Sequence, residues 1–375
     1  MSQDQKNPRS IVLAGGGTAG HVNPLLATAG EIQQQSPQTR LTIVGTEYGL
    51  EKELVPAAGY ELRTISRVPF PRRINAAALK FFSQFRDAIS QAGEILDEVQ
   101  ADTVVGFGGY VSPPVYLAAR KRKLRIVVHE GNARPGIANR LGARFAQFVA
   151  LSFQSTPLRA KRGKTVLTGL PIRFEIRDLA NTLQQQTADA LRNQMAVKYD
   201  FDPALPVLVV TGGSLGAQHI NEVVAQCAQE ILDRGFQVLH LTGKDKSASV
   251  KAQIAGVQGN YRVLEYVTEM NEIYAFADLI ISRSGAGMVS EICALGIPAV
   301  FVPLPIGNGE QALNAADVVA SGGAILITDA NFTPDELRRQ VLPLLNHDLR
   351  KQMASRMRQV THADAAGQLA AIILQ

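Results

Sequence analysis

Short apolar runs rich in β-branched residues alternate with longer amphipathic stretches along the whole chain. The runs are apolar at successive positions and not only at alternate ones. Strands of this kind are buried on both faces, which is typical of parallel sheets covered by helices on either side. The pattern therefore predicts an α/β fold built from βαβ units. The strand candidates are Ile11–Ala14, Leu41–Val44, Thr103–Phe107, Ile126–Val128 and Phe148–Leu151 in the first half, and Val207–Thr211, Gln237–Leu241, Arg262–Glu265, Leu279–Ser282, Ala299–Val302 and Ala324–Ile327 in the second.

A weak internal repeat divides the chain into two similar halves. Gly16–Gly20 (Gly-Gly-Thr-Ala-Gly) and Gly212–Gly216 (Gly-Gly-Ser-Leu-Gly) each follow an apolar run and precede an amphipathic one. We expect two Rossmann-like, doubly wound parallel-sheet domains at residues 1–168 and 169–354. Because ligands of open α/β sheets bind beyond the carboxyl ends of the strands, we predict a site in a cleft that both domains face.

The composition narrows the classes of protein that remain. Of 375 residues, 46% are hydrophobic and 19% charged, which is ordinary for a globular chain of two domains. The two cysteines, Cys227 and Cys293, provide no disulfide framework and no Cys/His metal cluster, so a reducing compartment is expected. No apolar run approaches the roughly 18–20 residues of a membrane span, and the polar start lacks the core of a secretion signal. We therefore expect a cytoplasmic protein.

Charge is distributed unevenly between the halves. Residues 1–170 carry 22 Lys and Arg against 12 Asp and Glu, a net charge of +10, whereas residues 171–375 carry 16 against 21, a net charge of −5. A basic half favours an anionic partner such as nucleic acid, an anionic membrane or a phosphorylated substrate. The basic run Arg120–Lys123 has no interleaved aromatic residues, so we interpret it as a solvated turn and expect no nucleic-acid binding.

The first glycine-rich segment allows two interpretations. Gly15–Gly20 satisfies G-x-G-x-x-G, and Glu47 follows the second strand candidate about where a ribose-binding acid stands in dinucleotide-binding proteins. This favours an oxidoreductase that uses a nicotinamide or flavin cofactor. The alternative is a tight strand-to-helix turn in which glycine permits close packing.

Two further loops in the second half are suited to an anion. The loop Thr211–Gly216 leads into a helix N-terminus, whose backbone N–H groups favour negative charge, and Ser214 adds a hydroxyl donor. The loop Ser282–Gly287 precedes another helix, and Glu291 early in that helix suits the two hydroxyls of a ribose. A favourable charge near a helix N-terminus explains Glu291 equally simply. The combination predicts a nucleoside diphosphate site, with Arg173 placed to neutralise the diphosphate.

A metal-dependent alternative has little support in the sequence. Its single D-x-D sequence, Asp200–Asp202, is followed by Pro203 and precedes a strand candidate instead of following one. We interpret it as a solvated linker and not as a site for a divalent ion. Neither H-E-x-x-H nor C-x-x-C occurs, and we expect no metal.

The chain contains seven motifs in an order and spacing typical of one family: Gly16–His21, Gly106–Tyr110, His129–Asn132, Thr168–Arg173, Gly212–Ala217, Arg283–Glu291 and Gln311–Ala315. With them, nearly the whole chain resembles the MurG family of bacterial glycosyltransferases. The resemblance implies the GT-B architecture, no tightly held cofactor, and a C-terminal helix at residues 355–375 that completes the first domain. It implies inverting transfer of N-acetylglucosamine from UDP-GlcNAc to lipid I (undecaprenyl-pyrophosphoryl-MurNAc-pentapeptide), forming lipid II, by a peripheral protein at the cytoplasmic face of the bacterial membrane.

The resemblance also assigns a donor pocket. Many relatives have a His where this chain has Ile306, which cannot donate a hydrogen bond, so any polar role there is open. The implied donor residues are Arg173 and Ser214 near the diphosphate, Val267 beside the uracil, Ala286, Gly287, Met288, Val289, Ser290 and Glu291 around diphosphate and ribose, and Gln311 at the sugar. From the first domain, Thr18, Ala19, Gly20 and Asn132 would close over the sugar and the acceptor.

Inverting transfer needs a base on the acceptor hydroxyl. His21 is the first candidate because an imidazole changes charge near neutral pH. Glu130, at the end of a strand candidate, is the rival base. A third possibility is that the two residues act together as one relay. The alternative for His21 is that it only orients the acceptor or the loop by hydrogen bonding.

A basic, aromatic segment at residues 71–86 predicts contact with the membrane. It places Ile74, Leu79, Phe82 and Phe85 among basic residues, as in a helix that lies in the interface and meets anionic headgroups. The alternative is an ordinary helix that packs its apolar stripe into the core.

Three other functions stay open at this point. They are a dinucleotide-dependent oxidoreductase, a non-catalytic lipid-binding or nucleotide-binding protein, and a glycosyltransferase with another glycolipid acceptor or nucleotide sugar.

Overall fold

The computed structural model describes residues 9–70, 76–185, 187–213, 216–306, 308–360, 362 and 364–375, with the backbone alone at 76–79. The chain forms two compact units, which we call unit 1 (residues up to Arg173, together with Asp364–Gln375) and unit 2 (Phe174–Ala363). Each unit contains one sheet in which all paired strands are parallel. The predicted α/β class with two doubly wound domains is therefore confirmed.

The sheet of unit 1 is covered by helices on both faces. Along β1, Ile11 and Leu13 pack among residues of α1 and α17, whereas Val12 and Ala14 pack among residues of α3 and α4. This burial of successive side chains on opposite faces accounts for the uninterrupted apolar runs in the sequence. The strand order is β3-β2-β1-β4-β5-β6-β7. The strands are β1 (Ser10–Ala14), β2 (Arg40–Gly45), β3 (Leu62–Thr64), β4 (Thr103–Gly106), β5 (Arg125–Glu130), β6 (Phe148–Leu151) and β7 (Lys164–Leu167); the helices are α1 (Ala19–Gln35), α2 (Glu51–Ala57), α3 (Ala76–Glu98), α4 (Ser112–Lys121), α5 (Ile137–Gly142) and α17 (Ala365–Leu374).

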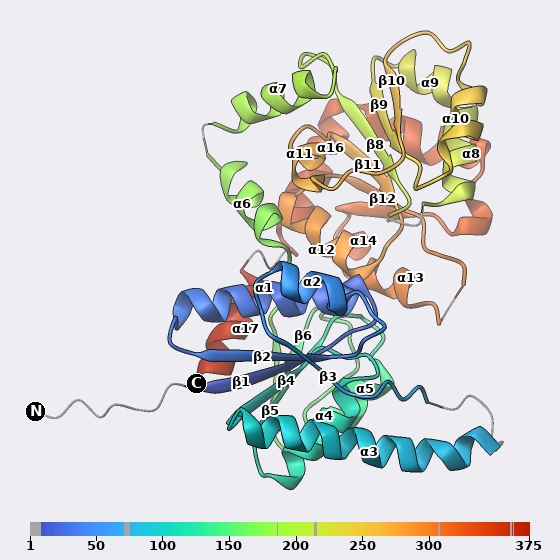
Figure 1. Ribbon diagram of the computed structural model, residues 1–375. Helices are drawn as coiled ribbons and strands as arrows, with labels where there is room; N and C mark the ends of the chain where they lie inside the picture. Colours follow the sequence, from blue (N-terminus) through green and yellow to red (C-terminus); the bar gives the residue numbers. More distant parts are fainter. Residues whose placement is uncertain are drawn as a thin grey trace, which may run out of the picture. The chain divides into compact units, whose positions relative to one another are not determined.

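The last helix of the chain belongs to unit 1. Figure 1 shows α17, in red, beside α1 and β1 of that unit. Arg125 on β5 donates from Nη1 to the carbonyl oxygen of Ile373 (2.6 Å) and from Nη2 to that of Ile372 (2.6 Å). A guanidinium at the last carbonyls of a helix satisfies acceptors that have no partner within the helix. The side chains of Leu369 and Ile373 are buried in the core of unit 1.

The boundaries between the units differ slightly from those expected at residues 168/169 and 354/355. The chain leaves unit 1 after Arg173 because the backbone N–H groups of Thr168 and Gly169 still bond the carbonyl oxygen of Leu151, and Leu170 is buried. Residues 355–358 complete α16, which packs against α12 in unit 2. The return to unit 1 therefore begins at Asp364.

Unit 2 repeats the same plan, with strand order β10-β9-β8-β11-β12-β13. Its core lies between the sheet and α8, with side chains from Ile220, Val224 and Phe332 among those that are fully buried. The strands are β8 (Val207–Thr211), β9 (Gln237–Leu241), β10 (Tyr261–Leu264), β11 (Leu279–Ser282), β12 (Ala299–Phe301) and β13 (Ala324–Leu326); the helices are α6 (Phe174–Thr182), α7 (Ala188–Lys198), α8 (Gln218–Gln226), α9 (Ala228–Leu232), α10 (Ser247–Gln253), α11 (Met270–Ala275), α12 (Ala286–Leu295), α13 (Glu310–Asn314), α14 (Ala316–Ala320), α15 (Pro334–Glu336), α16 (His347–Arg358), the 3-10 helices η1 (Asp329–Asn331) and η3 (Leu342–Leu345) and the π-helical η2 (Leu337–Val341).

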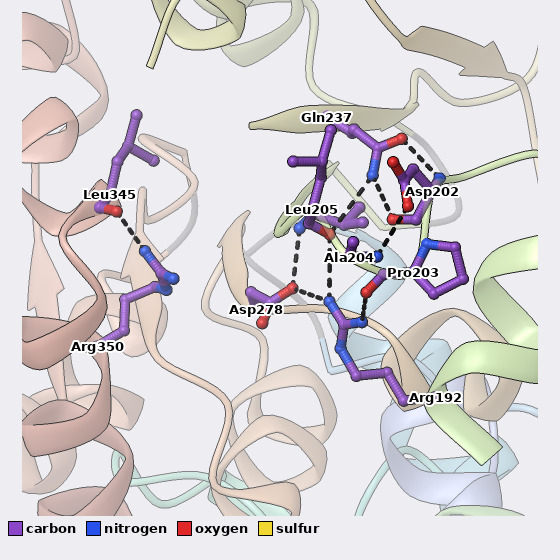
Figure 2. A network of polar contacts seen from close by, with 10 residues as sticks. Arg192, Asp202, Pro203, Ala204, Leu205, Gln237, Asp278, Leu345 and Arg350 are labelled. Carbon is purple, nitrogen blue, oxygen red and sulfur yellow. Dashed lines mark hydrogen bonds and ion pairs between the residues drawn. The ribbon is translucent and has the colours of Figure 1, made fainter. Parts of the chain in front are cut away.

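A polar network fixes the amino ends of the central strands in unit 2 (Figure 2). Arg192 on α7 donates to the carbonyl oxygen of Pro203 (2.6 Å) and to the Asp278 carboxylate (2.8 Å), which also accepts from the backbone N–H of Val207 (2.8 Å). Asp202 bonds the Gln237 side chain through its backbone and caps Ala204 through its carboxylate. The D-x-D sequence is thus part of a turn at the edge of the sheet away from the carboxyl ends of the strands.

None of the helices in the described part of the chain combines the length and apolar character that a bilayer crossing needs.

Candidate active site

Both glycine-rich loops lie where the order of strands in their sheet reverses. In unit 1 this point is between β1 and β4, and in unit 2 it is between β8 and β11. At such a point the loops that follow the two strands diverge, which leaves a crevice at the carboxyl edge of the sheet where ligands of open α/β sheets bind. Of the candidates, residues 18–21 follow β1 in unit 1 and residues 286–291 follow β11 in unit 2. Glu130 and Asn132 lie at and after the end of β5, which is not beside the switch point.

His21 lies in the first turn of α1, with its ring partly buried. The Nδ1 atom is 3.1 Å from the carbonyl oxygen of Gly16 and 3.4 Å from Oγ1 of Thr18. Because a carbonyl oxygen can only accept, the bond to Gly16 requires the proton on Nδ1, and the neutral ring then carries its lone pair on Nε2. This is the tautomer that a general base acting through Nε2 needs.

Gly108, in the loop after β4, makes room for that ring. Its φ is +104°, which disfavours any residue with a side chain, and a Cβ there would lie 3.1 Å from Nε2 of His21. The motif Gly106–Tyr110 therefore contributes space beside the imidazole as well as a turn.

Glu130 ends β5 and is 2% exposed. Its Oε1 accepts from the backbone N–H of Asn132 (3.0 Å), and its Oε2 accepts from the backbone N–H of Gly136 (3.0 Å) and from Nδ2 of Asn139 (3.0 Å). Both oxygens are thus engaged in holding the loop 131–136. The geometry favours a loop-organising role over the role of base for which the sequence made Glu130 a candidate.

Two residues that the sequence analysis overlooked extend this network. Asn139 also donates to the carbonyl oxygen of His129 (2.9 Å), and its Oδ1 accepts from the Tyr116 hydroxyl (2.9 Å). His129 itself is buried beside Phe107, and burial lowers its pKa to about 4, so its ring is neutral at pH 7. No spacing rule joins residues 116, 130 and 139, because the contact exists only once α4, α5 and β5 have packed.

The remaining unit 1 candidates differ in accessibility. Thr18, Ala19 and Gly20 are exposed at the N-terminus of α1, where no acidic residue occupies the first turn. Asn132 is half-buried, and its carbonyl oxygen accepts from Oγ1 of Thr156 (3.1 Å). Arg173 is the half-buried last residue of unit 1.

The loop 15–18 is already bonded to a carboxylate from another part of the protein. The backbone N–H of Gly17 donates to Oε2 of Glu51 (2.8 Å), a fully buried residue at the start of α2. Glu47, which the dinucleotide interpretation required, is exposed on the preceding loop. An amide that would face a pyrophosphate in that interpretation is therefore bonded to the protein itself.

In unit 2, the loop after β11 combines a buried cation with an open helix N-terminus. Arg283 is 9% exposed and donates to the carbonyl oxygens of Val302 (3.1 Å) and Pro303 (3.0 Å) and to Asp329. The Oγ of Ser284 is buried and has no hydrogen-bond partner among the described residues. The N-cap of α12 is Gly285, and the first turn of the helix contains no acidic residue. Helix amides of this kind favour an anion.

Glu291 lies in the second turn of α12, four residues after Gly287. Residues four apart share one face of a helix, about 6 Å apart along its axis. No described atom lies within 4 Å of the position that a Cβ would take at Gly285 or Gly287, so the space beside these two glycines is open, whereas Glu291 itself is 9% exposed. Glu291 accepts a hydrogen bond from the buried Tyr274 hydroxyl on α11 (3.3 Å). Sequence reasoning missed Tyr274, since nothing in its local pattern distinguishes it from a core residue.

Two side chains of α13 tie the next loop to this site. Oε1 of Gln311 accepts from the backbone N–H of Leu304 (2.9 Å), and Nδ2 of the buried Asn314 lies 3.4 Å from the carbonyl oxygen of Ser284. Ile306 is exposed at the surface of that loop. The side-chain oxygen of Gln311 is therefore occupied by a backbone N–H, whereas its side-chain nitrogen remains a hydrogen-bond donor.

The other donor candidates occupy varied positions. Ala286, Gly287, Met288 and Ser290 are partly exposed in the first turns of α12, whereas the Val289 side chain is buried, so a ligand can meet Val289 only through its backbone. Val267 is half-buried after β10. Ser214 lies outside the described residues.

The glycines of the loop after β8 permit a close approach of the backbone. A Cβ at Gly216, where φ is +67°, would lie 2.2 Å from the carbonyl oxygen of Thr242, and one at Gly212 would lie 2.2 Å from the backbone nitrogen of Ala217. Only glycine fits at these two positions.

Each unit is a wound parallel sheet with a glycine-rich loop where the strand order reverses. Unit 2 adds a helix whose first turn has no acidic residue and whose second turn carries the buried Glu291. This plan suits a two-domain nucleotide-sugar enzyme. Residues 11–151 match the glycosyltransferase family 28 N-terminal domain, and residues 207–369 match the glycosyltransferase family 28 C-terminal domain. The chain belongs to glycosyltransferase family 28 and, within it, to the MurG family. The predicted enzyme class is thus confirmed, and the oxidoreductase and non-catalytic alternatives are wrong.

Each of the similar proteins described next matches at least 90% of the chain. It is 46% identical, over 100% of its length and 98% of the relative's, to the UDP-N-acetylglucosamine--N-acetylmuramyl-(pentapeptide) pyrophosphoryl-undecaprenol N-acetylglucosamine transferase of Paenarthrobacter aurescens. It is 47% identical to the protein of the same name from Bifidobacterium adolescentis, over 90% of each chain. Among solved structures it resembles Acinetobacter baumannii MurG, with a TM-score of 0.79 and 28% identity over 98% of this chain and 99% of that one. A UDP-GlcNAc 2-epimerase from Neisseria meningitidis, at 15% identity and a TM-score of 0.69 over 98% and 99%, shares the fold alone.

Proposed function

We propose that this protein transfers N-acetylglucosamine from UDP-GlcNAc to lipid I, the undecaprenyl-pyrophosphoryl-MurNAc-pentapeptide, and so forms lipid II for peptidoglycan synthesis. The observation that carries the donor half of the proposal is the open face of α12. Amides around Gly287 suit a diphosphate, and Glu291 one turn further suits the two hydroxyls of a ribose. A nucleoside diphosphate is the ligand that needs both. The relatives that match 90% and 100% of the chain carry the name of this transferase.

The leaving group is the UDP diphosphate, which gathers negative charge as the bond to the sugar breaks. Backbone amides at the start of α12, the hydroxyls of Ser214 and Ser284, and the Arg173 guanidinium are the donors that we assign to it. Donors fixed in place before the reaction stabilise developing charge without reorganising, which makes this the largest contribution in many enzymes. Val267 would lie beside the uracil, and the Gln311 amide would face the sugar.

The acceptor half of the reaction falls to unit 1. We assign the base to His21: its Nε2 takes the proton of the acceptor hydroxyl while that oxygen bonds to C1 of the sugar. The bond from C1 to the phosphate oxygen breaks at the same time, UDP leaves with the electron pair, and the configuration at C1 inverts. The Nδ1 bond to Gly16 supports this role because it keeps the lone pair on Nε2. Thr18, Ala19, Gly20 and Asn132 would contact the sugar and the acceptor.

The acceptor is anchored in a bilayer, so we propose that unit 1 binds an anionic membrane from the cytoplasmic side as a peripheral protein. Phe82 is 71% exposed on α3, whereas Phe85 is half-buried and stacks on Phe81 (ring centroids 5.3 Å apart) and against Phe70 (6.0 Å). An exposed aromatic side chain beside packed aromatic rings, in a strongly basic half of the chain, suits the interface between membrane and water. Ile74 and the Leu79 side chain lie outside the described residues.

Transfer of labelled sugar tests the proposal directly. Purified protein receives UDP-[14C]GlcNAc and vesicles that contain lipid I, with parallel reactions in which UDP-glucose replaces the donor or undecaprenyl phosphate replaces the acceptor. We expect label in the lipid fraction only with UDP-GlcNAc and lipid I. Transfer of label to another lipid would show that the acceptor differs from the one that we propose. If UDP protects the protein against heat but no label is transferred, the proposed reaction itself is contradicted.

A further inference from the structure

Glu51 is a buried carboxylate that the proposed reaction does not use. It begins α2 and is 0% exposed. Its Oε2 accepts from the backbone N–H of Gly17 (2.8 Å), and its Oε1 accepts from the backbone N–H (3.0 Å) and the hydroxyl (2.8 Å) of Thr46. Burial by itself raises the pKa of Glu51, but the hydrogen bonds from Gly17 and Thr46 together bring it below the usual value. The group is therefore a charged carboxylate at neutral pH.

Three glycines enclose this carboxylate so closely that a Cβ at any of them would force the Glu51 side chain to move. A Cβ at Gly16 would lie 2.4 Å from Oε1 of Glu51, one at Gly49 would lie 1.9 Å from Oε2, and one at Gly45 would lie 2.6 Å from Cγ. Two of these glycines come from the end of β2 and the loop before α2, and one comes from the loop before α1. The packing fixes the carboxylate in one position against the glycine-rich loop.

A single peptide group joins Glu51 to His21. The N–H of the Gly16–Gly17 peptide donates to Glu51, and the carbonyl oxygen of the same peptide lies 3.1 Å from Nδ1 of His21. A peptide whose N–H is bonded to an anion is polarised, and its carbonyl oxygen becomes a stronger acceptor. The carboxylate thus acts on the imidazole through one amide, with no bond between their side chains.

We propose that Glu51 is a positioning residue for His21: through the Gly16–Gly17 peptide it holds the proton on Nδ1 and raises the basicity of Nε2. The proposal deepens the assignment of His21 as base and rests on it only for its effect on turnover. The negative charge favours the protonated imidazole, so the pKa of His21 is higher with Glu51 than without it. Of the other titratable groups that the structure describes in unit 1, His129 interacts electrostatically with His21 and is neutral at pH 7. Glu130 uses its oxygens to hold the loop 131–136.

Glu51→Gln is the informative variant because it keeps the size and removes the charge. Glu53 on the same helix is exposed, so Glu53→Gln is the matched control. A carboxylate accepts on both oxygens, whereas glutamine has one acceptor, so the variant also loses a bond to Gly17 or to Thr46. The measurement is NMR titration of His21 with labelled histidine, assigned by loss of its signals in His21→Ala.

We expect the pKa of His21 to fall by about 0.5 to 1 in Glu51→Gln and to stay unchanged in Glu53→Gln. Turnover should fall roughly tenfold, with the acidic limb of the pH profile moved to lower pH by the same amount as the pKa. A loss of turnover with no change in the pKa of His21 would reduce Glu51 to a structural residue and overturn the proposal.

The unsubstituted protein provides a second test that does not depend on the folding of a variant. Nitrogen chemical shifts of neutral His21 distinguish the two tautomers, and we expect the proton on Nδ1. A proton on Nε2 would overturn the proposal even if turnover falls in Glu51→Gln. Full turnover of His21→Ala would instead remove His21 as the base while leaving the coupling to Glu51 to be judged by its titration.

Discussion

The Tyr274 hydroxyl lies 3.3 Å from Oε2 of Glu291, so α11 reaches across to fix a carboxylate on α12. The same hydroxyl is 3.1 Å from the sulfur of Met288. A carboxylate that meets two ribose hydroxyls must present its oxygens in one orientation. Tyr274 provides this from a position that is 1% exposed.

Replacement of Tyr274 by Phe should weaken recognition of the ribose. Loss of one hydrogen bond to a charged group is worth about 1.5–3 kcal/mol, of which part appears as a rise in KM for UDP-GlcNAc of about tenfold. Turnover at saturating donor should change little. The preference for UDP-GlcNAc over its 2′-deoxyribose analogue should shrink in the variant, as measured by the ratio of kcat/KM. An equal loss for both donors would mean that Tyr274 supports only the packing of α11.

His21→Ala should lower turnover by about 10²–10⁴ while leaving the affinity for UDP-GlcNAc close to that of the parent, because His21 lies in unit 1. Steady-state transfer and calorimetric titration of the donor provide the two values. His347→Ala is the control, since that side chain is exposed in unit 2. Unchanged turnover in His21→Ala would exclude His21 from the chemistry.

Glu130→Gln should act on stability and loop order, not on proton transfer. One of the amides at Asn132 and Gly136 would lose its acceptor, which costs about 1–3 kcal/mol in free energy of unfolding. Urea denaturation measures this cost against Glu94→Gln, an exposed control on α3. The acidic limb of the pH profile should stay where it is, and a shift of that limb would restore Glu130 as the base.

Stability should fall as the pH drops below about 6.5. Burial lowers the pKa of His129 to about 4 and that of His240 to about 3, so each ring stays neutral in the folded state while the unfolded chain takes up a proton near its ordinary value of 6.5. The unfolded state therefore binds more protons in this window, and the free energy of unfolding decreases by about 1.4 kcal/mol per pH unit for each ring. Between pH 7 and pH 5 the free energy of unfolding should fall by about 2 kcal/mol for each histidine.

Denaturation of single variants at pH 7 and pH 5 tests whether these two histidines cause the pH dependence of stability. His240→Gln removes the titrating ring that bonds Asn221 and Tyr261 in unit 2, and His129→Gln removes the one in unit 1. Each variant should lose its share of the pH dependence even if it is less stable at pH 7. An undiminished dependence in both variants would place the effect in other groups.

Phe82→Ser should weaken binding to anionic vesicles roughly tenfold, because an inserted Phe contributes about 1.5–3 kcal/mol. The substitution should leave the circular dichroism spectrum and the melting temperature intact, since Phe82 is exposed. Val197→Ser, an exposed apolar position in unit 2, is the control. Co-sedimentation with vesicles measures binding, and loss of folding in Phe82→Ser would favour the interpretation of this segment as a core helix.

The amino-acid sequence by itself determined the class of fold and the family. All the predicted strands are present, with ends that differ by at most two residues. Most of them are central strands of a parallel sheet, which are buried on both faces and must therefore be apolar throughout. The glycine loops were equally visible, since glycine favours the positive φ at Gly108 and alone allows the backbone contact at Gly216. The order of these motifs was sufficient to identify the family.

Only the tertiary structure decided which polar groups face one another. The edge strands β3 and β7 escaped prediction because they are short and incompletely buried, so they need no continuous apolar run. Glu51, Glu130 and Tyr274 gain their roles from amides and carboxylates on other elements, at sequence separations that follow no helical or strand period. Hydrophobic burial leaves a periodic trace along the chain, whereas a hydrogen bond between two packed elements leaves none.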